Sequence, residues 1–328
     1  MSARILKDQS ADLQFARNVL SKGSVVSLPT ETVYGLACNA LDKDAVRAIF
    51  EIKGRPLTDP LIVHIDSMEM ASSVAIFSDR AYRLAEYFWP GPLTIILPKK
   101  DCIPSIVCAG LSTVGVRLPS NTLMQKVIKY CGFPLAAPSA NPFGYISPTS
   151  PEPVLKTIGN KVSGVFDGGV CKFGVESTVV DLSNPKKIIL LRPGPISSVE
   201  IEEVLSLPVF NRVVHNEPES VSISPGQHSK HYSPETTLII FEDDSFIDIN
   251  ENDAVIYLQR PIRKGANFYY LSDNGDWKEI CHSLFNLLYK LDQDSKILRI
   301  FIQVVKDDHP YALVYRDRVH RAAFKSLG

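Results

Sequence analysis

The 328-residue chain has no continuous apolar stretch near the ~20 residues that a membrane-spanning helix needs. Asp8, Asp12 and Arg17 interrupt its amino-terminal segment, so this segment does not form the apolar core of a secretory signal. The chain also has no excess of one charge, because 35 Lys and Arg residues stand against 36 Asp and Glu residues. This balance argues against tight, nonspecific binding to nucleic acid. We therefore expect a soluble protein.

The six cysteines form no CxxC pair, and their irregular spacing fits neither a disulfide framework nor a zinc site. This usage indicates a reducing, cytoplasmic location, with most cysteines serving as small buried apolar residues. The two common phosphate-binding motifs, GxxxxGK[ST] and GxGxxG, are also missing. Any phosphate must therefore be bound by basic side chains and a metal ion.

Six short segments place hydroxyl and amide side chains beside Pro or Gly. Each adjoins an apolar, β-branched run, where a strand should give way to a turn, and open α/β sheets bind ligands at such strand ends. A single segment of this kind is most simply a capped surface turn. Together, with Arg55, Arg117 and Arg192 near separate strand ends, they favour one cleft for an anionic ligand such as phosphate or carboxylate. The segments are residues 29–36, 53–56, 112–119, 137–142, 176–181 and 191–194.

Strand-length apolar runs alternate with helical patterns along residues 1–207, which predicts a twisted, mixed, open α/β sheet. Helices are expected over residues 42–53, 79–89 and 199–205, with Tyr82 on a buried face. Residues 208–234 lose periodicity and read as a linker, and 27 residues without structure of their own suggest a functional lid or a docked segment. Residues 235–328 predict a second, smaller, Rossmann-like α/β domain with a long helix over residues 276–291.

The order of these motifs closely resembles the YrdC-like family in its long, two-domain form. The resemblance covers about residues 5–205 and continues through SPG (224–226), KHYSP (230–234) and VYRDRVHRAA (314–323). It implies an L-threonylcarbamoyladenylate synthase, a nucleotidyltransferase that makes threonylcarbamoyl-AMP and pyrophosphate from L-threonine, bicarbonate or CO2, and ATP. The product serves N6-threonylcarbamoyladenosine formation in tRNA. The catalytic-domain motifs are PTETVYGLACNA (29–40), KGRP (53–56), PLIVHI (60–65), WPGPLTIIL (89–97), VGVRLP (114–119), PLAAPSAN (134–141), ESTVVDL (176–182) and LRPGPIS (191–197).

The resemblance implies that Lys53 and Arg55 are the catalytic residues and face the triphosphate of ATP. Mg2+ is the expected cofactor, held mainly by phosphates and water. A downstream threonylcarbamoyl transferase is a possible recipient of the product, and the pathway does not require this protein to hold tRNA. The implied threonine-binding residues are Thr32, His64, Arg117 and Ser177, and the implied ATP-binding residues are Lys53, Arg55, Asp59, Thr113, Ser139, Asn141, Ser147, Arg192 and Tyr232.

Asp59 is a departure from the family pattern, which commonly has Asn at this position. An ionised Asp accepts hydrogen bonds but cannot donate them, and it would repel a nearby phosphate. Asp59 must therefore turn toward Mg2+ or the adenosine hydroxyls, or else nucleotide affinity is weakened.

Two alternative functions stay open from the sequence. An Arg- and Lys-lined α/β face could hold double-stranded RNA by shape without any synthase activity, although the near-neutral charge counts against this. A paralogue that keeps the fold but has lost the activity is disfavoured because the motif residues are present.

Overall fold

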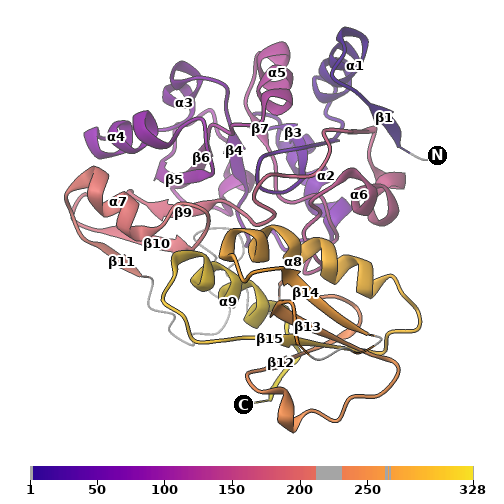
Figure 1. Ribbon diagram of the computed structural model, residues 1–328. Coiled ribbons are helices and arrows are strands. Elements are labelled where there is room, and N and C mark those ends of the chain that lie inside the picture. The colour runs from indigo at the N-terminus through magenta and orange to yellow at the C-terminus, as the bar shows by residue number, and fades with distance from the viewer. Residues whose placement is uncertain (1–2, 212–230, 263–264, 266, 328) are drawn as a thin grey trace.

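The computed structural model describes residues 3–211, 231–262, 265 and 267–327. Within these residues the chain forms an 11-stranded mixed sheet followed by a five-stranded sheet, each with its own helices (Figure 1). The predicted lid segment lies largely outside the described residues, and so do SPG (224–226) and Lys230.

The strand order of the large sheet is β1-β8-β2-β3-β7-β4-β6-β5-β9-β10-β11. Its helices are α1 (Ser10–Leu20), α2 (Lys43–Lys53), α3 (Met68–Val74), α4 (Asp79–Phe88), α5 (Thr122–Cys131), α6 (Pro151–Thr157) and α7 (Ser198–Leu205). Its strands are β1 (Arg4–Leu6), β2 (Val26–Leu28), β3 (Gly35–Asn39), β4 (Ile62–His64), β5 (Leu93–Pro98), β6 (Thr113–Arg117), β7 (Leu135–Ala136), β8 (Gly164–Phe166), β9 (Thr178–Asp181), β10 (Ile188–Arg192) and β11 (Val209–Asn211).

The smaller sheet has the order β14-β13-β15-β12-β16, and all its neighbouring strands are parallel. Two helices, α8 and α9, lie on the side of this sheet that faces the large domain (Figure 1). The elements are β12 (Thr237–Phe241), β13 (Asp253–Gln259), β14 (Phe268–Ser272), α8 (Trp277–Asp292), β15 (Arg299–Gln303), α9 (Pro310–Ala322) and β16 (Lys325–Leu327).

Local sequence signals explain where several helices begin and end. Asp42 caps α2 by accepting hydrogen bonds from the backbone N–H groups of Asp44 and Ala45, and Gly54 ends the helix at φ 66°. Asp276 caps α8 in the same way. Four helices were expected, over residues 42–53, 79–89, 199–205 and 276–291, and each appears within one residue of those bounds. The interpretation of Tyr82 was wrong, because this residue is 46% exposed on α4.

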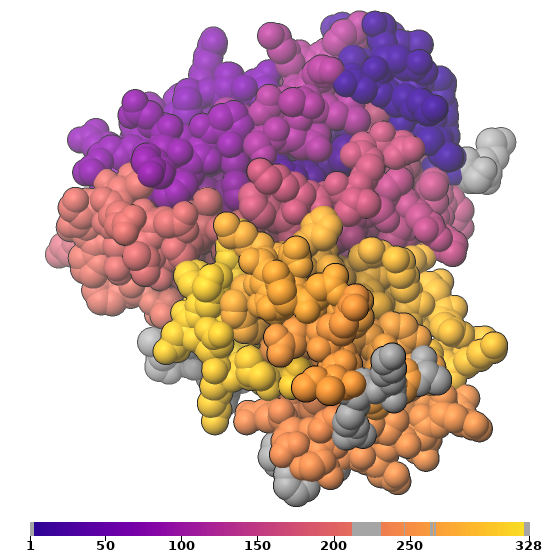
Figure 2. All heavy atoms as spheres, in the orientation of Figure 1, coloured from indigo at the N-terminus to yellow at the C-terminus, as the bar shows by residue number. Residues whose placement is uncertain are grey.

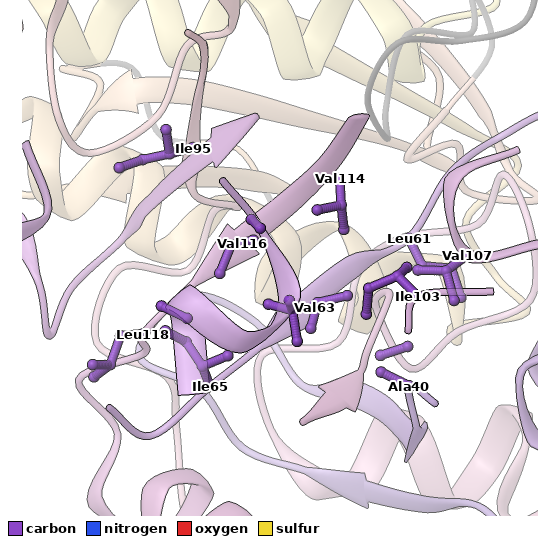
Figure 3. Close-up of a cluster of buried hydrophobic side chains, with 14 of the residues drawn as sticks. Ala40, Leu61, Val63, Ile65, Ile95, Ile103, Val107, Val114, Val116 and Leu118 are labelled. Atoms are coloured by element: carbon purple, nitrogen blue, oxygen red, sulfur yellow. The ribbon is translucent and has the colours of Figure 1, made fainter. Parts of the chain in front are cut away.

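β11 occupies the first residues of the segment expected to be a linker, since it pairs in parallel with β10 at the edge of the large sheet. The apolar core of the large domain includes Val63, Val114 and Val116, which come from the neighbouring strands β4 and β6 (Figure 3). The same register places the last residues of these strands, His64 and Arg117, side by side. It thus brings two residues implied for threonine binding to one edge of the sheet.

The two domains share a hydrophobic cluster, in which Val33, Ile146 and Val175 of the large domain pack with core residues of α8 and α9. In the view of Figure 2 the two domains touch along a broad front. Asp292 of α8 adds a polar contact between the domains, because it accepts a hydrogen bond from the Tyr145 hydroxyl at 2.5 Å. No helix among the described residues is long and apolar enough to cross a membrane.

Gly174 lies where the chain of the large domain passes directly against α8. A Cβ on this residue would stand 2.5 Å from the carbonyl oxygen of His282, and its φ of +71° is also unfavourable for other residues. We therefore expect Gly174→Ala to lower the free energy of unfolding by at least ~1 kcal/mol more than Gly169→Ala. Gly169 is a matched control, because it has the same φ and a Cβ added there would meet nothing within 4 Å. Equal unfolding curves for the two variants would contradict this reading of the domain contact.

Candidate active site

A cavity of about 50 Å³ lies at the strand ends where the predicted segments converge. Arg55, Arg117 and Arg192 all line it, as the sequence predicted for an anion-binding cleft. Thr32, His64, Ser139 and Ser177 also line it, together with His231 and Tyr232 from the chain that leads into the second domain. Residues from all six predicted segments therefore meet in one buried place.

Arg117 is held on all sides by protein atoms. Its Nε donates to the Gly91 carbonyl at 3.3 Å, and one terminal nitrogen donates to the Thr32 hydroxyl at 3.0 Å. The other terminal nitrogen lies 2.7 Å from a carboxylate oxygen of Glu31, and both side chains are only 4% exposed. Burial alone would raise the pKa of Glu31, but the Arg117 guanidinium outweighs burial and holds this pKa below its ordinary value. A ligand carboxylate that needs both terminal nitrogens must therefore compete with Glu31.

Arg55 has a carboxylate partner of its own. Its guanidinium lies 2.8 Å from a carboxylate oxygen of Asp59, and the two side chains are 2% and 0% exposed. The Arg55 side chain also donates to the backbone carbonyls of Asp59 and Pro60. Asp59 thus turns toward Arg55, an arrangement that the sequence analysis did not anticipate. The carboxylate cancels much of the charge that Arg55 would otherwise present to a phosphate.

Arg192 differs from the other two arginines. Its guanidinium donates to the carbonyl and to the hydroxyl of Ser177, each at 3.0 Å. Among the described residues, no carboxylate forms an ion pair with it. Arg192 is therefore the arginine lining the cavity whose positive charge is most available to an anionic ligand.

Lys53 does not line the cavity but stands behind its wall. Its ammonium donates to the carbonyl oxygens of Ser139 and Asn141, both at 2.6 Å, and approaches the Asn141 amide oxygen at 3.3 Å. Burial and the neighbouring Arg55 charge lower the pKa of Lys53 well below its ordinary value. In this structure Lys53 holds the 139–141 loop in place.

His64 ends β4 inside the cavity, and burial together with the nearby Arg117 charge lowers its pKa to about 3. The unfolded chain binds a proton on this histidine below about pH 6.5, whereas the folded protein resists it until about pH 3. Stability present above pH 6.5 is therefore lost as the pH falls.

We expect this loss to amount to about 2 kcal/mol from His64 alone between pH 6.5 and 5. Urea unfolding of the wild type and of His64→Gln at both pH values measures it, and the variant should lose that much less. The same loss in both proteins would contradict the assigned pKa.

His231 and Tyr232 form the wall of the cavity next to the second domain. Their rings meet edge to face at 4.1 Å, and the Tyr232 ring lies 5.4 Å from that of Phe285 in α8. Burial raises the pKa of Tyr232 to about 12, so its phenol stays protonated. Its hydroxyl has no hydrogen-bond partner among the described residues, although it is completely buried. A buried donor of this kind is well suited to a ligand.

The structure brings together all four residues implied for threonine, since Thr32, His64, Arg117 and Ser177 line the cavity. Four of the residues implied for ATP also line it, namely Arg55, Ser139, Arg192 and Tyr232. Another four of these residues stand behind the cavity wall, namely Lys53, Asp59, Asn141 and Ser147. Lys53 holds the 139–141 loop, Asp59 pairs with Arg55, and the Ser147 hydroxyl donates to Glu176. Thr113 lies at the opposite end of β6 from Arg117 and does not line the cavity, so its role stays a prediction.

The sequence assigned no site role to three charged residues that lie at or near the cavity. Glu31 and Glu176 stood within the quoted motifs but had no role assigned, and Arg318 comes from the closing helix of the second domain. The Arg318 Nε donates to Glu176 at 2.8 Å across 142 sequence positions. Only the motif VYRDRVHRAA pointed to this helix, and it did not indicate a contact with the first domain.

Two protein-family models match most of the chain. Residues 18–194 match the Sua5/YciO/YrdC family model, described as "Telomere recombination", and residues 196–324 match the model of the threonylcarbamoyl-AMP synthase C-terminal domain. The threonylcarbamoyl-AMP synthase of Pyrococcus abyssi is 42% identical over 231 residues, which is 70% of this chain and 68% of the relative. That of Bacillus subtilis is 42% identical over 229 residues, or 69% of this chain and 66% of the relative.

A solved structure of P. abyssi Sua5 in complex with L-threonine matches this fold with a TM-score of 0.87. The two chains are 32% identical, and the match covers 100% of each. The predicted mixed α/β sheet followed by a smaller α/β domain is thereby confirmed. The chain belongs to the Sua5/YciO/YrdC family, in the two-domain form that carries the threonylcarbamoyl-AMP synthase C-terminal domain.

Proposed function

We propose that this protein is an L-threonylcarbamoyladenylate synthase, which makes threonylcarbamoyl-AMP and pyrophosphate for the N6-threonylcarbamoyladenosine modification of tRNA. The observation that carries the proposal is the convergence of Arg55, Arg117 and Arg192 with hydroxyl and imidazole side chains in one buried cavity. Relatives named threonylcarbamoyl-AMP synthase, at 42% identity, support the same conclusion.

The reaction joins anionic partners, so alignment and charge neutralisation are its main requirements. The threonine amine first combines with bicarbonate and loses water to give a carbamate. An oxygen of this carbamate then attacks the α-phosphorus of ATP, and the bond to the bridging oxygen breaks to release pyrophosphate. The carbamate is already an anionic nucleophile, so the step needs no strong base. This fits a cavity whose two histidines, His64 and His231, have lowered pKa values and stay neutral.

We place threonine between Arg117, Thr32, His64 and Ser177. Arg117 would bind the carboxylate, in competition with Glu31, while the two hydroxyls and the imidazole would contact the amine, hydroxyl or carbamate. We place the phosphates of ATP near Arg192 and Arg55, because Arg192 has no ion-pair partner among the described residues. Tyr232 would offer its phenol to the nucleotide.

Mg2+ is proposed to accompany ATP and to reduce the charge of the triphosphate. No group of three or more His, Cys, Asp or Glu residues in the described part of the chain could hold a metal ion. The carboxylates nearest the cavity, Glu31, Asp59 and Glu176, are each paired with an arginine. A metal ion held by phosphates and water fits such a site, since Mg2+ commonly keeps several waters.

The cavity is far smaller than the ~300 to 1,000 Å³ typical of cofactor sites. Its wall must therefore move when ATP enters. The proposed lid of residues 208–234 fits this need, although residues 212–230 lie outside the described part of the chain. We further propose a cytoplasmic location, in keeping with six free cysteines, and a downstream threonylcarbamoyl transferase as recipient of the product.

Pyrophosphate release from ATP tests the proposed function. We expect release only when threonine, bicarbonate and Mg2+ are all present, because the carbamate must form before adenylation. The same rate without threonine would refute the assignment. Salt-sensitive binding of double-stranded RNA without this activity would favour the RNA-binding alternative instead.

A further inference from the structure

Arg318 of α9 is completely buried although it belongs to the second domain. Its Nε donates to a carboxylate oxygen of Glu176 at 2.8 Å, and another nitrogen donates to the Pro193 carbonyl at 2.9 Å. It also contacts Asp317, its neighbour on the helix. The guanidinium lies 5.4 Å from the centre of the Tyr232 ring. One side chain of the second domain thus contacts two residues that line the cavity, Glu176 and Tyr232, and the carbonyl of the residue that follows Arg192.

The contact with Arg318 matters because Glu176 is itself part of the cavity wall and lies near Arg192. It lines the cavity, its other carboxylate oxygen accepts a hydrogen bond from Ser147 at 2.6 Å, and its side chain is only 8% exposed. It directly precedes Ser177, which receives both hydrogen bonds from Arg192. Arg192 interacts electrostatically with the Glu176 carboxylate. Without a cation of its own, Glu176 would be drawn to Arg192.

We propose that Arg318 is a positioning residue of the nucleotide site, which engages Glu176 and so leaves Arg192 free to bind the phosphates of ATP. The inference rests on the proposed function for the identity of the ligand. The second domain thereby contributes to the site, because Arg318 of α9 keeps the positive charge of Arg192 available for the ligand. Arg318 needs no contact with the ligand in this arrangement.

Calorimetric titration of the full chain with Mg2+–ATP, and separately with threonine, tests the proposal. Arg318→Met should raise the Kd for ATP about ten- to a hundredfold, the usual scale for loss of a charge-assisted contact, and leave the Kd for threonine within about threefold. The double variant Arg318→Met/Glu176→Gln should restore the ATP Kd to within about threefold of the wild type, because removing both members of a buried pair is often nearly neutral. General damage to packing would not be rescued in this way.

Arg321→Met is the matched control, since Arg321 lies on the same helix and forms an ion pair with Asp317 rather than with Glu176. It should bind ATP as the wild type does. If Arg318→Met does not fold, the test rests on the double variant Arg318→Met/Glu176→Gln. An ATP Kd equal to that of the wild type in this double variant supports the proposal. Equal weakening in the single and double variants would overturn it, and so would unchanged affinity in Arg318→Met.

A threonine Kd that shifts in place of the ATP Kd would show that Arg192 serves a carboxylate and would also overturn the proposal. Because binding is measured without turnover, the result is separate from the proposed function. A wild type that binds ATP but releases no pyrophosphate would refute the synthase assignment and leave this test intact. A wild type that does not bind ATP would overturn the inference itself.

Discussion

Arg117→Met is expected to lower the free energy of unfolding by about 3 to 5 kcal/mol, because it leaves the Glu31 carboxylate buried without its cation. The two groups are 2.7 Å apart, and each side chain is 4% exposed. The variant should also raise the KM for threonine about ten- to a hundredfold, since it loses the proposed carboxylate contact. Denaturant unfolding and steady-state kinetics measure the two effects.

The double variant Glu31→Gln/Arg117→Met separates these effects. It should recover most of the stability, because no unpaired charge remains, but it should not recover threonine binding. Recovery of both properties would mean that Arg117 serves only to neutralise Glu31. A normal threonine KM in the single variant would remove Arg117 from the proposed threonine site.

Arg55→Met is expected to lower kcat about ten- to a hundredfold through lost stabilisation of phosphate charge in the transition state. It should also destabilise the protein, because Asp59 is completely buried and lies 2.8 Å from the Arg55 guanidinium. The steady-state rate of pyrophosphate release at saturating ATP and threonine measures kcat. An unchanged kcat in a folded variant would place Arg55 outside the chemistry.

Asp59→Asn is the matched counterpart, because it keeps the shape of the side chain and removes the charge that offsets Arg55. We expect it to lower the KM for ATP by about tenfold, because the carboxylate behind the cavity wall no longer cancels the charge that Arg55 presents to a phosphate. A KM that rises would show that Asp59 orients Arg55 more than it screens it. Either result resolves the role of this acidic residue.

Much of the fold could be predicted from local sequence. Helix α2 ends at the predicted residue Lys53, α7 ends at the predicted residue Leu205, and α8 lies within one residue of the expected range 276–291. Periodicity and capping depend on residues a few positions apart, so they are visible in the sequence. Tyr82 was misplaced because a broad apolar stripe does not reveal where the neighbouring elements stop covering a helix.

The candidate site could likewise be predicted only in part. Local sequence patterns predict arginines, hydroxyl residues and a lone histidine at strand ends, and these residues do line one cavity. They could not determine which carboxylate each arginine contacts, because Glu31 with Arg117 and Glu176 with Arg318 are separated by 86 and 142 positions. These pairs become visible in the folded protein, since strand register and domain docking bring distant charges together where burial makes their pairing necessary.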